Sequence, residues 1–334
     1  MKLNILSEIP ERFLTVSLKT LSRVFTGPTL IELEGEIRKP LFISTLLHGN
    51  EHSGFYALQK LLTKYKNKLP RSLIIFIGNI EAATQNVRLV GDQVDFNRIW
   101  SGGQSEEEKI AQDVIKFCKA RHIWASIDIH NNTGTNPYYS CVNKLEDPFL
   151  ALASLFGETV IYFTEPHEVQ SKAFAEVCPS VTLECGKSGD EKGVEVLVNY
   201  LEKVMHLHDL DEIEFNKERL KIFETEARIK LHPAADLDFE FNPTTEKDLS
   251  FPSDFDFLNF STIPKGTCIG YTAGLTEHPL MVIDNNNYNI FSEYFKIEGK
   301  KIITEKHIFP SMFTKDQSVA KQDCLGYLMH KLNI

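Results

Sequence analysis

Apolar runs alternate with amphipathic stretches along the first two thirds of the chain, and this pattern predicts strands and helices in turn. Apolar residues recur at helical spacing over about 51–68 and again between 194 and 205, and Ser105–Glu108 forms a capping box before a third helix. Strands that alternate with helices indicate a mostly parallel sheet covered on both faces, so we predict an α/β fold. The predicted buried strands are 41–47, 73–78, 124–129, 158–163 and 180–183.

The remaining patterns complete the predicted organisation. Apolar and charged residues alternate over 29–38, as in a half-exposed edge strand, and 79–104 lacks periodicity, which is typical of a functional loop. After about residue 215 the composition changes: the sequence becomes rich in Phe, Asn and Asp and contains short β-like runs. We therefore predict two domains: an α/β domain at 1–220 and a small β-rich domain at 221–334.

Composition and charge narrow the class of protein. The chain has 334 residues, an ordinary hydrophobic content and a net charge of -10, which argues against nucleic acid as a partner. Six scattered cysteines without a C-x-x-C pair favour free thiols in a reducing compartment. Glu8 and Pro10 interrupt the N-terminus where a signal peptide needs an apolar core, and no run of 18 apolar residues suggests a membrane span. We expect a cytoplasmic protein, with a homo-oligomer as one option.

Two predicted strands end in histidine, and this suggests a metal site. His48 follows the strand at 41–47, Asn50 is a good helix N-cap, and Glu51 falls in the first turn of the next helix. His130 ends the strand at 124–129 in the same way. Open α/β sheets place their ligands at this edge. Two imidazoles and a carboxylate form a zinc site that leaves a position for water, so we predict a metal ion on His48, Glu51 and His130.

Other polar residues fall at the same predicted edge of the sheet. Glu184 ends the strand at 180–183, where a carboxylate can take a proton from metal-activated water and pass it to a leaving amine. Asn97 and Arg98, in the long loop, suit the carboxylate of a substrate. Asp95 is suited to hold the distal nitrogen of a ligand histidine, and Arg88 is a candidate for stabilising an oxyanion. A surface carboxylate at Glu184 and surface salt bridges at Arg88 and Arg98 are the alternative interpretations.

Together these motifs resemble the succinylglutamate desuccinylase/aspartoacylase family of the zinc carboxypeptidase clan. The resemblance implies a carboxypeptidase-like α/β/α sandwich, one zinc ion per chain, and hydrolysis of the amide bond of an N-acyl amino acid. It also implies roles for the residues already named: zinc ligands at His48, Glu51 and His130, a general base and acid at Glu184, and a carboxylate clamp at Asn97 and Arg98. The ordered motifs are H-x-x-E (His48, Glu51), D-x-N-R (Asp95, Asn97, Arg98), D-x-H-N (Asp128, His130, Asn131) and E-x-G (Glu184, Gly186).

The sequence departs from the family pattern in two places. The spacing from Arg88 to Arg98 is about two residues longer than usual. No arginine occurs between Arg121 and Arg219, where relatives hold the second carboxylate of the substrate. A lysine would replace that arginine only as a point charge, so a dicarboxylic substrate is weakly supported. The candidate lysines are Lys144, Lys172 and Lys187.

Three alternatives stay open at this point. His48 to His52 also fits H-x-x-E-H, an inverted zincin motif, but that geometry needs a helix through Gly49 and Asn50, which are poor helix formers. A metallocarboxypeptidase or peptide amidase would use the same residues on a longer substrate; openness of the active site in the catalytic domain at 1–220 decides this, and the domain at 221–334 is a candidate to cap it. A non-catalytic zinc-binding domain would not need Glu184 and Arg98.

Overall fold

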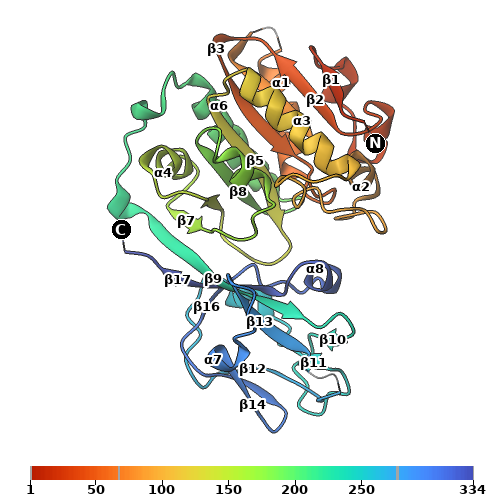
Figure 1. The fold of residues 1–334 in the computed structure, drawn as a ribbon, viewed down its shortest axis with the longest axis vertical. Helices are drawn as coiled ribbons and strands as arrows, with labels where there is room; N and C mark the ends of the chain where they lie inside the picture. The colour runs from red at the N-terminus through yellow and green to blue at the C-terminus, as the bar shows by residue number, and fades with distance from the viewer. Residues whose placement is uncertain (1, 67, 276–277, 334) are drawn as a thin grey trace. The chain divides into compact units, whose positions relative to one another are not determined.

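The protein is described by a computed structural model that covers residues 2–66, 68–275 and 278–333 (Figure 1). The chain divides into two compact units. The first contains residues up to 131 together with 138–221, and the second contains 132–137 with 222–333. The last residue of the strand that carries His130 and the short segment after it therefore belong to the second unit.

The first unit is built on a mixed sheet with the strand order β1-β2-β4-β3-β5-β8-β6-β7. Neighbouring strands are parallel in the pairs β1–β2, β3–β4, β3–β5 and β6–β7, and antiparallel in β2–β4 and β6–β8. This mostly parallel sheet confirms the predicted α/β class. The strands are β1 (Asn4–Leu6), β2 (Thr29–Leu33), β3 (Gly35–Thr45), β4 (Leu69–Ile77), β5 (Ala125–Asn132), β6 (Tyr139–Val142), β7 (Thr159–Tyr162) and β8 (Ser180–Lys187).

Helices cover both faces of this sheet. On one face α3 (Glu106–Ala120), drawn in yellow in Figure 1, and α5 (Gln170–Phe174) pack against the side chains of Phe42 and Phe76. On the other face α1 (Ser53–Lys64) approaches Thr45 and packs against α6 (Glu191–His206). Residues 42 and 45 of one strand point to opposite faces, so the arrangement has three layers. Two further helices are α2 (Ile80–Gln85) and α4 (Asp147–Ser154).

Several predicted boundaries were wrong. The edge strand expected at 29–38 ends at Leu33, and β3 runs from Gly35 through Pro40 to Thr45. The register of β3 against β4 shifts between Ile37 and Leu41, which accommodates a proline that has no N–H to donate. The helix expected at 51–68 begins at Ser53 and ends at Lys64.

The first turn of that helix also differs from the prediction. His52, not Asn50, is the N-cap residue, so Glu51 lies before the helix rather than in its first turn. The capping box at Ser105–Glu108 is present as predicted, with both reciprocal hydrogen bonds formed. The loop expected at 79–104 contains α2, whereas 86–105 has neither helix nor strand. β6, α4 and α5 were not predicted.

The second unit confirms the expected β-rich C-terminal region. In its first sheet β13 and β17 pair with β9, and β16 pairs with β17, all antiparallel. The stacked rings of Phe255 and Phe313, with centroids 4.3 Å apart, lie in its core. The elements are β9 (Lys221–Leu231), β13 (Leu280–Asp284), β16 (Phe309–Ser311), β17 (Gly326–Lys331), α7 (Phe291–Tyr294), α8 (Gln317–Gln322) and a second sheet of β10 (Leu237–Asp238), β11 (Leu249–Ser250), β12 (Cys268–Tyr271), β15 (Lys301–Thr304) and β14 (Phe295–Glu298).

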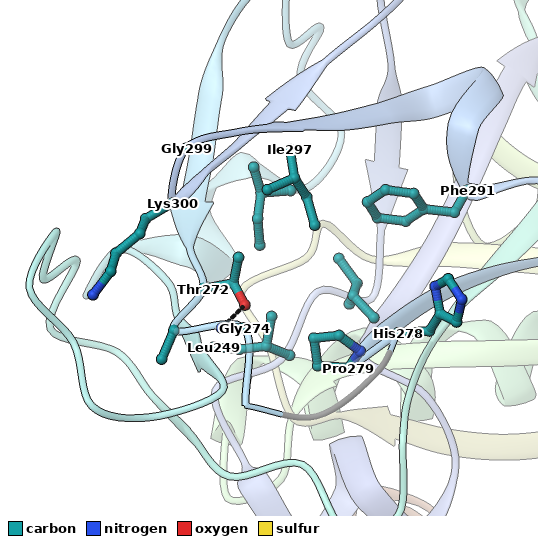
Figure 2. Close-up of a pocket in the computed structure, with 12 residues that line it drawn as sticks. Leu249, Thr272, Gly274, His278, Pro279, Phe291, Ile297, Gly299 and Lys300 are labelled. Atoms are coloured by element: carbon teal, nitrogen blue, oxygen red, sulfur yellow. Dashed lines mark hydrogen bonds between the residues drawn. The ribbon is translucent and has the colours of Figure 1, made fainter.

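A pocket in the second unit is lined mostly by apolar side chains, among them Leu249, Phe291 and Ile297 (Figure 2). The hydroxyl of Thr272 accepts a hydrogen bond from the N–H of Gly274, at 3.1 Å. None of the described residues that line the pocket is a carboxylate or an arginine. This pocket therefore lacks the groups that the predicted chemistry needs.

Within the described ranges, no helix has both the length and the apolar character that crossing a bilayer would require.

Candidate metal centre and active site

The three predicted metal ligands lie together in the first unit. Glu51 lies between two imidazoles, with its Oε1 atom 2.8 Å from Nδ1 of His48 and its Oε2 atom 2.7 Å from Nδ1 of His130. The candidate ligand atoms of the three residues all lie within 4.8 Å of one another, and all three side chains are buried. The backbone N–H of Asn131 also donates to Oε2 of Glu51, at 3.2 Å.

A tight turn after β3 places two of these ligands. Leu46 adopts a left-handed conformation, with φ of 55°, and the chain then turns through Gly49 before α1 begins. A Cβ atom at Gly49 would lie 2.1 Å from the carbonyl carbon of Ala82 in α2, so only glycine fits there. His130 comes instead from β5, where it is in line with Asp128 on one face of the sheet.

Each histidine has a carboxylate on its second ring nitrogen. Nε2 of His48 lies 3.0 Å from Oδ1 of Asp95, and Nε2 of His130 lies 2.8 Å from Oδ2 of Asp128. The other carboxylate oxygen of Asp128 accepts a hydrogen bond from Ser44, at 2.6 Å. Each Nδ1 is directed toward the shared centre, and with a metal ion on Nδ1 the proton of each imidazole would be held on Nε2 by its aspartate, because a carboxylate accepts.

The partner of His48 was predicted, but the role of Asp128 was not. The sequence contained a usable signal, since residues two apart in a strand share a face and Asp128 precedes His130 by two. Ser44 gave no such signal, because it meets Asp128 only through the register of β3 with β5.

The charges of the centre stabilise one another. Burial opposes protonation of both histidines, yet Glu51 and Asp95 raise the pKa of His48, and Asp128 and Glu51 hold the pKa of His130 well above its ordinary value. Burial likewise opposes ionisation of Glu51, but the two imidazoles lower its pKa. For Asp95, interactions with His48, Arg88 and Arg98 outweigh burial and hold the pKa well below its usual range.

Arg88 is directed toward the same centre. One guanidinium nitrogen donates to Oδ2 of Asp95, at 3.1 Å, and the other lies 3.8 Å from Oε1 of Glu51. The carbonyl of Arg88 also accepts a hydrogen bond from the N–H of Gly49, which ties the loop to the ligand-bearing turn. The unusual spacing to Arg98 therefore does not remove Arg88 from the site.

The predicted carboxylate clamp lies beside His130. The side-chain oxygen of Asn97 accepts a hydrogen bond from the backbone N–H of Gln170, at 3.0 Å, so its amide nitrogen is turned toward Nε2 of His130, 3.4 Å away. Arg98 donates to the carbonyl of Asn97, at 3.0 Å. No sequence pattern indicated Gln170, which orients Asn97 through its backbone.

Glu184 is buried in β8, opposite Tyr139 of β6 in the strand register. Its Oε2 atom has no hydrogen-bond partner among the described residues. Burial raises the pKa of Glu184 to about 8, with opposing contributions from the His130 and Glu51 charges. The side chain is therefore not a surface carboxylate, and it lies within electrostatic range of the metal ligands.

The structure does not support the inverted zincin arrangement. Residues 48–52 are not helical, because α1 begins at Ser53. His52 lies outside the cluster of candidate ligand atoms found among the described residues.

The lysines considered for a second substrate carboxylate differ in their surroundings. Lys144 pairs with Glu176, at 3.1 Å, and its ammonium lies over the ring of Phe149. Lys172 lies in α5, and Lys187 is exposed at the end of β8. Neither the geometry nor the charge of the site selects one of them.

Residues 38–206 match the family model described as the succinylglutamate desuccinylase/aspartoacylase catalytic domain. None of the curated protein sequences matches the chain.

Solved structures with a similar fold include three enzymes of this kind. Succinylglutamate desuccinylase from Chromobacterium violaceum has 16% identity and a TM-score of 0.58, with 91% of this chain and 89% of that chain covered. Succinylglutamate desuccinylase/aspartoacylase from Rhodobacter sphaeroides has 15% identity and a TM-score of 0.59, with 91% and 89% covered. Murine aminoacylase 3 has 14% identity and a TM-score of 0.53, with 90% and 97% covered. At these identities the likeness shows the fold.

Proposed function

The chain belongs to the succinylglutamate desuccinylase/aspartoacylase family, and on this premise we propose that it is a zinc-dependent hydrolase that cleaves the amide bond of a small N-acyl amino acid. The observation that carries the proposal is the buried cluster of His48, Glu51 and His130, whose ligand atoms lie within 4.8 Å of one another. The same site contains an arginine for a substrate carboxylate and a buried glutamate with a raised pKa.

The donor set fits a zinc ion. Two imidazole nitrogens and one carboxylate are a common set of ligands for catalytic zinc, and each imidazole has the second carboxylate partner that such ligands usually have. His48, Glu51 and His130 would hold one ion per chain. When bound, zinc supplies Lewis-acid chemistry, which polarises a carbonyl and makes water more acidic.

Glu184 is proposed as the group that moves the proton. Its unpartnered Oε2 atom is available to a water molecule, and its raised pKa of about 8 suits a carboxylate that must hold a proton between two steps. It would take the proton from the attacking water and deliver it to the nitrogen of the leaving amino acid. Positive charge at the ligand cluster would favour its ionised form before the reaction.

The two arginines are proposed to contact different parts of the substrate, the free carboxylate and the carbonyl of the amide bond. Arg98 and the amide nitrogen of Asn97 would bind the free carboxylate of the amino acid. Arg88, which lies 3.8 Å from Glu51, would stabilise the negative charge that develops on the carbonyl oxygen. The absence of arginine between Arg121 and Arg219 favours an amino acid with a single carboxylate.

A cytoplasmic location is part of the proposal. None of the six cysteines forms a disulfide in the structure, as expected in a reducing compartment.

Metal analysis combined with a substrate screen tests the function. Protein loaded with zinc should contain about one ion per chain and hydrolyse at least one member of a panel of N-acetyl, N-succinyl and N-formyl amino acids. The variant Glu184→Ala should keep its zinc and lose at least ~100-fold in kcat, the usual scale for a general base. Glu195→Ala, an exposed position in α6, is the matched control. A zinc-loaded protein that turns over no member, or a Glu184 variant with normal kcat, would contradict the proposal.

A further inference from the structure

The end of β8 follows a tightly fixed path just after Glu184. Gly186 has φ of 72°, and a Cβ atom there would lie 2.6 Å from the ring of Tyr138. A Cβ atom at Gly193, in the first turn of α6, would lie 2.3 Å from the carbonyl oxygen of Cys185. The Cys185–Gly186 backbone is therefore enclosed by neighbouring groups on two sides.

A buried side chain, Asn131, binds this backbone from a third side. Its Nδ2 atom donates to the carbonyl oxygen of Gly186, at 3.0 Å, and lies 3.4 Å from that of Cys185. The same amide contacts Ser53, the first residue of α1: Nδ2 donates to its hydroxyl, at 2.8 Å, and Oδ1 accepts from its backbone N–H, at 3.0 Å. One side chain thus joins β5, the start of α1 and the end of β8.

The polarity of these contacts specifies asparagine. A backbone N–H can only donate and a carbonyl oxygen can only accept, so the amide of Asn131 has one possible orientation. Aspartate would keep the acceptor for the Ser53 N–H but would direct an oxygen at the Gly186 carbonyl. An alanine would remove these hydrogen bonds from the buried backbone groups, which is destabilising.

We propose that Asn131 is a positioning residue that sets the separation between the metal ligands and Glu184. Its backbone N–H donates to the proposed ligand Glu51, and its side chain binds the end of the strand that carries Glu184. The positions of both groups therefore depend on one residue. The inference deepens the proposed function and rests on it: a general base must sit at a set distance from the carbonyl that it serves. A displacement of about 1 Å can lower a catalytic rate ~100-fold.

The test compares Asn131→Ala with a matched loss of another buried amide. Asn143 donates to the carbonyl of Phe163, at 3.1 Å, beyond the carboxyl end of β6. The strands β6 and β8 are antiparallel, with Tyr139 opposite Glu184 and Cys141 opposite Thr182. Asn143 therefore lies toward the start of β8, away from Glu184. Asn131→Ala should keep about one zinc per chain and a KM within ~3-fold of wild type, with kcat lower by ~100-fold. Asn143→Ala should keep kcat within ~3-fold.

Hydrogen exchange in the metal-free protein gives a readout that does not depend on activity. In Asn131→Ala the amide of Ser53 and those of 184–188 should exchange faster than in wild type and in Asn143→Ala. If Asn131→Ala does not fold, Asn131→Asp replaces it. In that variant the Ser53 amide should exchange as slowly as in wild type, whereas the amides of 184–188 should exchange faster. Its kcat should fall by about the same factor as in Asn131→Ala.

Each failure has its own signature. The proposal is overturned if the amides of 184–188 exchange at the wild-type rate in both Asn131 variants. A normal kcat in these variants also overturns it, and so does a loss of zinc that matches the loss of activity. A zinc-loaded wild type that hydrolyses nothing refutes the proposed function instead. In that case the exchange at Ser53 and 184–188 still decides whether Asn131 holds the strand end.

Discussion

Asp95 and Asp128 fix the orientation of the two metal-site histidines in different surroundings. Asp128 is buried, and its second oxygen accepts from Ser44. Asp95 is more exposed, and its second oxygen accepts from Arg88. Because each imidazole would present Nδ1 to the proposed ion, both aspartates would act on the metal through the histidine that they orient.

We expect Asp128→Asn to weaken zinc binding 10- to 100-fold, the usual scale for removing such a partner. The substitution keeps the shape but replaces an acceptor by an amide that can turn its nitrogen toward His130. Competition with a chromophoric chelator measures the dissociation constant. Asp113→Asn, at an exposed position in α3, should not change it. Equal constants for the two variants would show that Asp128 does not act on the ion.

For Arg98→Lys the expected effect is on KM. Lysine keeps the charge but loses the planar pair of donors, so the KM should rise by about tenfold while kcat changes less. Steady-state kinetics on the best substrate of the panel measures both. Arg121→Lys, which alters an arginine paired with Glu32 elsewhere in the unit, is the control. An unchanged KM would place the substrate carboxylate elsewhere.

Zinc affinity should rise with pH. The carboxylates around His48 and His130 outweigh burial and raise the pKa of both groups, so a proton competes with the metal at each Nδ1 atom. As the pH falls through those pKa values the affinity is lost, by roughly tenfold per pH unit for each proton released. Chelator competition at pH 6, 7 and 8 tests the sign, and an affinity that does not change with pH would contradict it.

At the scale of elements, the approach of α1 to the sheet depends on one glycine. A Cβ atom at Gly54 would lie 2.3 Å from Oγ1 of Thr45 in β3 and 2.9 Å from a methyl carbon of Ile129 in β5. Both strands lead into the metal site, and α1 begins two residues after Glu51. Close packing at Gly54 therefore helps to define where the ligand-bearing turn lies.

We expect Gly54→Ala to destabilise the protein despite the better helix propensity of alanine. The gain in propensity is at most about 1 kcal/mol, whereas overpacking a rigid interior costs typically ~1–3 kcal/mol. Urea denaturation of the metal-free protein measures the free energy of unfolding. Gly157→Ala should be near neutral, because the nearest atom to an added Cβ is the Tyr138 carbonyl oxygen, at 3.9 Å. A Gly54 variant as stable as wild type would mean that α1 can shift without cost.

The sequence predicted the elements that have strong local patterns and missed those that depend on distant partners. The apolar runs that became β4, β5 and β8 were recognised because both faces of these strands are buried. The strand β3 was divided wrongly, because its first residues were assigned to the edge strand expected at 29–38, whereas pairing with β4 shows that one strand continues to Thr45. Strand β6 is four residues long and carries no pattern of its own.

The same distinction applies to the site. His48, Glu51 and His130 were predicted because each follows an apolar run that ends at one edge of the sheet. Asn131 was noticed only as part of a motif, because its partners Ser53 and Gly186 are fixed by tertiary packing. The roles of Glu184, Asn97 and Arg98 stay predictions.

At the scale of the whole molecule, the chain alternates between two units, each with its own apolar core. The segment 132–137 packs within the second unit, where Thr135 donates to Asp256 through both its N–H and its hydroxyl. Its neighbour Asn131 belongs to the first unit. The division into domains at 1–220 and 221–334 stays a prediction.

Removal of zinc should lower the stability of the whole chain. The ligands come from residues 48, 51 and 130, so an unfolded chain has no preformed site and binding favours the folded state. Free zinc at a hundredfold excess over the dissociation constant adds about 2.7 kcal/mol, which corresponds to a rise of several degrees in Tm for a protein of this size. Calorimetry of chelated and zinc-loaded protein measures the difference. As the control, His130→Ala should unfold at the same Tm with and without zinc. If the Tm of the wild type does not change with zinc either, the ion does not stabilise the protein at this cluster.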